Sequence, residues 1–85
     1  MIIGMSEWVV YILLCSDGTL YTGISNRLEH RLESHHGGVA SKYTRTRLPV
    51  KLVHQERHPN RSSALKREAA IRKLSRSEKQ RLARV

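Results

Sequence analysis

The sequence predicts a small α+β domain, on three observations. The run from Val9 to Cys15 is apolar or aromatic throughout, as in a strand that is buried on both faces. Turn residues, Ser16-Asp17-Gly18, separate it from a second short strand expected from Thr19 to Ile24, so the pair forms a β-hairpin. Farther along the chain, helical segments with capping residues alternate with a third strand.

The length of the hairpin turn decides which side chains share a face. A three-residue turn with Gly18 in the left-handed region pairs Leu13 with Tyr21 and Tyr11 with Gly23, and puts both tyrosines on one face. A two-residue turn shifts the register by one residue and separates them. Serine at the first turn position favours the longer turn. The paired phenols are then either a reactive floor facing a gap at Gly23 or strand tyrosines packed for contact area.

Length and charge restrict the function. The 85 residues predict one domain over residues 1–85, with residues 1–7 frayed or in a short strand extension. The net charge of +9, from 16 Lys and Arg against 7 Asp and Glu, favours nucleic acid as partner over a membrane or a merely soluble surface. The single cysteine, Cys15, excludes an intramolecular disulfide and fits a reducing cytoplasm. We expect neither a signal peptide nor a membrane span.

The first helix is predicted from about Arg27 to His36, with Asn26 as N-cap, Glu29 completing a capping box and Gly37-Gly38 as its end. Two leucines, Leu28 and Leu32, mark its inner face.

Arg31 and His35 fall beside these leucines, one turn apart on the same side of the helix. A long cation and an imidazole can reach over a site from there. The alternatives are a surface arginine whose stem packs on apolar residues, and a polar histidine in a fraying last turn.

A basic loop and a third strand are expected next. The loop of residues 37–47 carries three cations and one aromatic ring: Lys42, Arg45, Arg47 and Tyr43. Such cations hold phosphates while the ring stacks on a base, although a solvated loop has the same composition. The third strand is expected from Val50 to Arg57 because of its apolar residues Val50, Leu52 and Val53, and Pro49 before it is tolerated at the start or edge of a strand.

One residue of the second helix breaks its apolar pattern. This helix is predicted from a cap at Asn60 or Ser62 to about Leu74. Its inward stripe consists of apolar side chains: Ala64, Leu65, Ala69 and Ile71. Glu68 projects into this stripe, where a carboxylate costs free energy unless it is paired, hydrogen bonded or bound to metal. It is therefore either a functional carboxylate or one half of a buried ion pair with an arginine.

A short terminal helix opens at Ser75, with Glu78 completing a capping box, and runs to about Arg84 with Leu82 as its anchor. The C-terminal third is strongly basic, which favours phosphate contact. Neither zinc-ligand spacing nor a glycine-rich phosphate loop occurs.

Five positions, in this order and spacing, resemble the GIY-YIG nuclease superfamily, and most of all its short, stand-alone, single-domain bacterial branch. Val9-Val10-Tyr11 corresponds to the first signature triplet and Tyr21-Thr22-Gly23 to the second, and Arg31, His35 and Glu68 follow. The resemblance runs from about Trp8 to Leu82. It implies a three-stranded antiparallel sheet flanked by helices, with the active site on one face of the sheet.

The resemblance also implies a reaction: hydrolysis of DNA phosphodiester bonds with one Mg²⁺ or Mn²⁺ ion. Tyr21 would be the general base or activate the nucleophile, and Tyr11 would orient it or the water. Arg31 would stabilise charge on the phosphoryl oxygens. His35 would assist proton transfer or hold Tyr21, and Glu68 would bind the metal. With one carboxylate visible, we expect the ion to keep most of its waters and to bind weakly without DNA.

The expected function is thus a metal-dependent endonuclease, structure-directed or non-specific because no separate DNA-binding domain is present. Branched, damaged or single-stranded DNA is the expected substrate, in DNA repair in the cytoplasm, with RNA as an alternative. We expect a monomer or weak dimer. The expected nucleic-acid contacts are Lys42, Tyr43, Arg45, Arg47 and Arg72. The rival function is a nucleic-acid-binding module that does not cut; a weaker third is an accessory subunit that acts through a protein partner.

Overall fold

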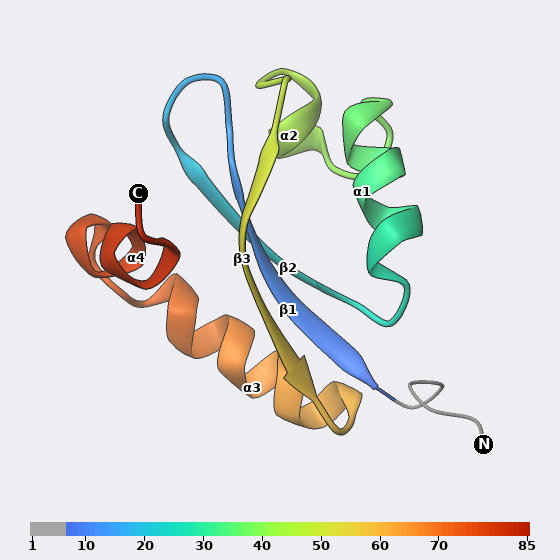
Figure 1. Cartoon of the computed structure of the whole chain (residues 1–85), viewed down its shortest axis with the longest axis vertical. Helices are drawn as coiled ribbons and strands as arrows, with labels where there is room; N and C mark the ends of the chain where they lie inside the picture. Colours follow the sequence, from blue (N-terminus) through green and yellow to red (C-terminus); the bar gives the residue numbers. More distant parts are fainter. Residues whose placement is uncertain (1–6) are drawn as a thin grey trace.

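The computed structural model describes residues 7–85, over which three strands and four helices form. They are β1 (Trp8–Leu14), β2 (Leu20–Ser25), α1 (Leu28–His36), α2 (Lys42–Arg45), β3 (Lys51–His58), α3 (Arg61–Arg72) and α4 (Arg76–Ala83). The strands form one antiparallel sheet in the order β2-β1-β3. Helices α1 and α2 lie on one side of this sheet and α3 and α4 on the other (Figure 1). Apart from Glu7, the predicted frayed segment 1–7 lies outside the described residues.

The hairpin has the three-residue turn that its sequence favours. Gly18 has a φ of 85°, and the Cys15 N–H donates to the Thr19 carbonyl at 2.8 Å. Tyr11 accordingly pairs with Gly23, and Leu13 with Tyr21. Both predicted pairs are confirmed, so the two tyrosines share one face of the sheet.

Strand β1 supplies both hydrophobic cores, one from each face. Val10 and Ile12 pack with Ala64 and Ile71 beneath α3, and Leu82 of α4 closes this core. The second core is beneath α1, and its buried members are Tyr11, Leu13, Cys15 and Val50, with Leu28 and Leu32 packed against them. An apolar run with no polar face was the expected signature of such a central strand.

A bulge in β3 decides which of its side chains face α3. The register shifts between Ile12, which pairs with His54, and Leu13, which pairs with Leu52, so β3 holds one extra residue there. Since Ile12 belongs to the core beneath α3, His54 faces that helix, and Glu56 and His58 follow by alternation.

Three local predictions were wrong. Strand β2 extends to Ser25, and the N-cap of α1 is Arg27, whose side chain makes no capping hydrogen bond. The Asn26–Glu29 capping box therefore does not form. The segment 37–47 is not all loop, because the Ser41 hydroxyl caps the four-residue helix α2. In α3, Leu65 and Ala69 are exposed, since this helix rests on the narrow stripe of Ala64 and Ile71.

Candidate active site

Tyr11 lies across Gly23 and reaches His35. Its side chain is buried, and its Oη lies 2.9 Å from Nε2 of His35. A Cβ at position 23 would lie 2.5 Å from this Oη and 2.6 Å from Cζ, which is closer than such atoms pack. Glycine is therefore required at this point of β2 so that the phenol can pass over the strand.

His35 is a fixed, buried side chain and not a frayed residue of the last helical turn. It is 1% exposed, and its Nδ1 lies 2.9 Å from Oγ1 of Thr44 on α2. The imidazole meets both tyrosines edge-on, with centroid separations of 5.7 Å to Tyr11 and 5.3 Å to Tyr21. Burial lowers the pKa of His35, and the charges of Arg31 and His36 lower it further, so the ring is neutral at pH 7.

A second aromatic pair covers the outer side of this cluster. Tyr43 of α2 stacks on Tyr21 with centroids 5.9 Å apart. The Arg47 guanidinium lies 3.9 Å from the centre of the Tyr43 ring, donates from Nη1 to the Tyr43 carbonyl and pairs with Asp17 at 2.9 Å. Arg47, a predicted nucleic-acid contact, thus joins α2 to the hairpin turn and holds Tyr43 in position.

Glu68 lies at the rim of the α3 stripe, beside the edge strand β2, and not in its middle as expected. Its Oε2 is 3.2 Å from Nη2 of Arg72, and the same Nη2 donates to the Thr22 carbonyl at 3.2 Å. The Glu68 side chain is 15% exposed and that of Arg72 57% exposed. This carboxylate therefore belongs to the edge of the sheet next to Gly23, and its arginine partner is on the surface.

The charges of three other predicted site residues act on Tyr11. Burial is the main cause that raises the pKa of Tyr11. Negative charge on Tyr21 and Glu68 raises it further, whereas the Arg31 guanidinium lowers it. The phenols come from the α1 face of the sheet, the guanidinium from α1 and the carboxylate from α3, so the site straddles the β2 edge.

The residues present suit a weakly held divalent cation. Within residues 7–85 no hydrogen bond engages Oε1 of Glu68, so one carboxylate oxygen is available. No cluster of three or more metal-binding side chains exists in this part of the chain. One hard oxygen ligand suits Mg²⁺, which keeps most of its water shell.

Glu56, which the sequence interpretation missed, is a half-buried carboxylate that α3 holds in an ion pair. Arg67 donates to it from Nε at 2.8 Å and from Nη2 at 2.9 Å, and Nε2 of His54 lies 2.8 Å away. Arg67, more than the histidines, lowers the pKa of Glu56 to about 2. The available signal was the alternation of His54, Glu56 and His58 along one face of a strand. With both oxygens engaged, Glu56 is a structural group and not a metal ligand.

A basic groove follows the edge strand from Tyr21 toward the hairpin turn. A hollow of about 270 Å³ is lined by Leu20, Tyr21, Thr22, Tyr43, Arg72 and Lys79. A second, of about 210 Å³, shares Leu20 and Lys79 with it and adds Gly18, Thr19 and Arg76. Neither lining contains an acid, so the groove suits a phosphate chain. Lys42 and Arg45 line a separate hollow beside α2.

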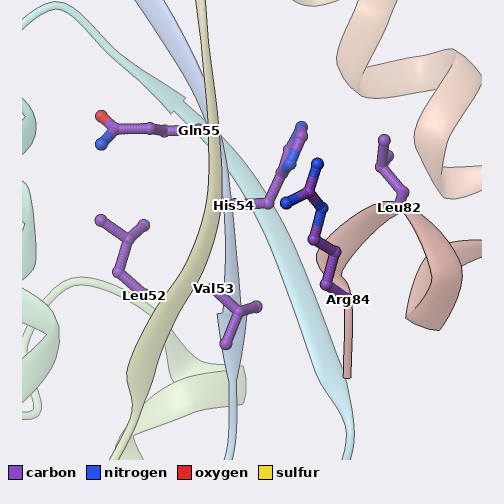
Figure 2. A pocket seen from close by; sticks show the side chains of 6 residues that line it. All are labelled: Leu52, Val53, His54, Gln55, Leu82 and Arg84. Atoms are coloured by element: carbon purple, nitrogen blue, oxygen red, sulfur yellow. The ribbon is translucent and has the colours of Figure 1, made fainter.

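A larger hollow, of about 540 Å³, lies over β3 and α4 and shares no residue with this cluster. Figure 2 shows His54 beside Leu82 and Arg84, with Leu52 and Gln55 extending from the opposite side of β3. The His54 imidazole is already hydrogen bonded to Glu56. Reactive groups therefore gather at the β2 edge and not in this hollow.

Comparison with known proteins agrees with this architecture. Residues 7–81 match the GIY-YIG catalytic domain. The chain belongs to the GIY-YIG family. Its GIY-YIG relatives include a UPF0213 protein of Syntrophus aciditrophicus, 55% identical over 76 residues, covering 88% of this chain and 87% of the relative. A UPF0213 protein of Natronomonas pharaonis is 51% identical over 77 residues, covering 91% of each chain.

Solved structures show the same GIY-YIG arrangement. The solution NMR structure of an E. faecalis protein superposes with a TM-score of 0.63 at 41% identity, covering 89% of this chain and 81% of that one. That of a UPF0213 protein from Bacillus halodurans gives 0.58 at 38% identity, with the same coverage. The resemblance and the predicted α+β fold are confirmed. Family membership supports a nuclease that acts on nucleic acid, at the level of the family. No helix within residues 7–85 is long and apolar enough to span a membrane.

Proposed function

We propose that this GIY-YIG chain is an endonuclease that hydrolyses DNA phosphodiester bonds with one Mg²⁺ or Mn²⁺ ion, and that DNA structure rather than base sequence directs it. The observation that supports the proposal is that the Tyr11 and Tyr21 rings lie 6.5 Å apart and that the charges of Arg31 and Glu68 both act on Tyr11. A module that only binds DNA needs cations but has no need of this set.

The side chains divide the work of phosphodiester hydrolysis. Arg31, exposed on α1, stabilises the negative charge that develops on the phosphoryl oxygens. The Tyr21 hydroxyl has no hydrogen-bond partner within residues 7–85, so once it has released its own proton to solvent the phenolate is free to take the proton of an attacking water. A phenol with an ordinary pKa of ~10 is scarcely ionised at pH 7, and positive charge beside it increases the fraction that is present as phenolate.

Glu68 would hold the divalent cation through its unengaged oxygen. Such an ion supplies Lewis-acid stabilisation of the charge on the phosphate. Since this chain offers one carboxylate there, affinity for the ion is weak until the phosphate adds its own oxygens.

Substrate binding is supported by the charge distribution. Arg72, Arg76 and Lys79 line the groove along β2, and Tyr43, a residue that is 37% exposed, lies at the start of this groove. Phosphate contacts of this kind fix register without reading base sequence, which favours non-specific or structure-directed cutting of DNA, as in repair.

A plasmid-nicking assay with Mg²⁺ or Mn²⁺ tests the proposal. We expect wild type to nick, and Glu68→Gln and Arg31→Ala to lose at least about 100-fold in rate. The matched controls are Glu33→Gln and Arg57→Ala, exposed residues of α1 and β3, which should cut like wild type. Wild type that binds DNA at low salt without nicking it would establish the rival function, a binding module.

A further inference from the structure

Thr44 is a buried hydroxyl with a single partner. Its side chain is 0% exposed, and Oγ1 lies 2.9 Å from Nδ1 of His35, its one hydrogen bond within residues 7–85. Helix α2 fixes the position of Thr44, because the Ser41 hydroxyl accepts hydrogen bonds from the N–H groups of Tyr43 and Thr44. The only fully buried residue of α2 thus points at the imidazole and not at a hydrophobic core.

Three groups with three protons form two hydrogen bonds, so the two possible arrangements differ in which hydroxyl is left without an acceptor. A neutral imidazole carries one N–H, and a threonine hydroxyl always has a proton to donate. If Nδ1 carried the proton, Thr44 would accept it, and its own O–H would be buried without an acceptor, which costs free energy. If Nε2 carries the proton, Thr44 donates to Nδ1 and His35 donates to Oη of Tyr11. The O–H left over is then that of Tyr11, which lies over Gly23 at the candidate site, where a bound phosphate or water can accept it.

We infer that Thr44 is a positioning residue that fixes His35 as its Nε2–H tautomer, and that Tyr11 therefore accepts from His35 and turns its own O–H toward the substrate. This inference rests on the proposed function for its catalytic meaning. It separates the two phenols: Tyr11 donates a hydrogen bond to the phosphate or the attacking water, and Tyr21 is the base. Burial raises the pKa of Tyr11, which keeps it protonated for this task.

The tautomer is measurable without any cleavage. In ¹⁵N-labelled protein at pH 8, the imidazole nitrogens of His35, identified by their absence in His35→Gln, should show Nε2 protonated and Nδ1 bare. Thr44→Ser, which keeps the hydroxyl, should give the same spectrum. Thr44→Val, which keeps the shape and loses the donor, should shift the population toward Nδ1–H. Finding Nδ1–H in wild type, or an unchanged tautomer in Thr44→Val, overturns the inference.

Cleavage then tests the positioning role. In an active nuclease, Thr44→Val should lower kcat by about 10-fold to 100-fold, as loss of outer partners of a functional histidine does, with DNA affinity unchanged. Thr44→Ser should restore the rate. Wild-type cutting by Thr44→Val overturns the role. A wild type that has the expected tautomer and does not cut contradicts the proposed function alone. If Thr44→Val does not fold, the wild-type and Thr44→Ser spectra still decide the tautomer.

Discussion

The phenol of Tyr11 occupies the space where a side chain at Gly23 would begin. An added Cβ would lie 2.5 Å from Tyr11 Oη, which is hydrogen bonded to His35 on its other side. The backbone of the edge strand and the buried end of the candidate site are therefore in direct contact.

Gly23→Ala should push Tyr11 away from His35. We expect a loss of about 1–3 kcal/mol in the free energy of unfolding, the usual effect of overpacking, and loss of the Tyr11–His35 hydrogen bond. Urea unfolding and the His35 imidazole spectrum measure these effects. Gly37→Ala is the control, since Gly37 has a φ of −81° and a Cβ there comes no closer than 3.4 Å to a neighbouring atom. Equal stability of the two variants would contradict the contact.

Glu56 should make the fold sensitive to acid. Its pKa of about 2 lies below the ordinary 4.5, so the folded state binds fewer protons than the unfolded state. The stabilisation, on the order of 2–3 kcal/mol, is complete above about pH 5 and is lost as the pH falls toward about 2. Urea unfolding between pH 6 and 2 measures it. Glu56→Gln should flatten this dependence, and the exposed Glu29→Gln should not. An unchanged slope in Glu56→Gln would contradict the prediction.

Tyr21→Phe should reduce cleavage by about 100-fold to 10,000-fold while leaving DNA affinity unchanged, because it removes the proposed base and keeps the ring. Tyr43→Phe is a matched control, since its ring stacks on Tyr21 at a centroid distance of 5.9 Å and its stacking survives the change. Single-turnover nicking and fluorescence anisotropy separate rate from affinity. Full activity in Tyr21→Phe would show that another group is the base.

Lys79→Ala should weaken DNA binding and reduce the slope of log K against log salt by about one, because one phosphate contact is lost. Lys79 lines both hollows of the groove along β2, so its effect should exceed that of Arg57→Ala, an exposed arginine on β3. Anisotropy titrations at several salt concentrations give the slopes. Equal slopes for both variants would mean that the bound DNA does not follow the groove along β2.

The hairpin and the phenol pair could be predicted because their determinants are local. Ser16-Asp17-Gly18 specifies the turn, the turn specifies the register, and the register puts Tyr11 opposite Gly23. The pattern of α3 was predicted less well. Its wheel showed Glu68 breaking an apolar stripe, but the true stripe is narrower, and Glu68 and Arg67 lie on its two borders.

The missed features depend on contacts between distant segments. Glu56 was hidden because the bulge in β3 and the position of α3 together decide that it meets Arg67. The partnership of Thr44 with His35 depends on a four-residue helix, which is too short to show a period in sequence. Only the capping residue Ser41 could have indicated it.

The alternation of β1 between two cores has a consequence for how the molecule opens. Tyr11 lies between Val10 and Ile12 in sequence. One face of β1 therefore packs against α3, and the other, which carries the phenol, is covered by α1. A partial unfolding that exposes the Tyr11 phenol would have to disrupt one of the two cores, so it cannot leave the rest of the domain folded. Amide hydrogen exchange along this strand should therefore report the global free energy of unfolding, and catalytic competence and foldedness should be lost in a single event.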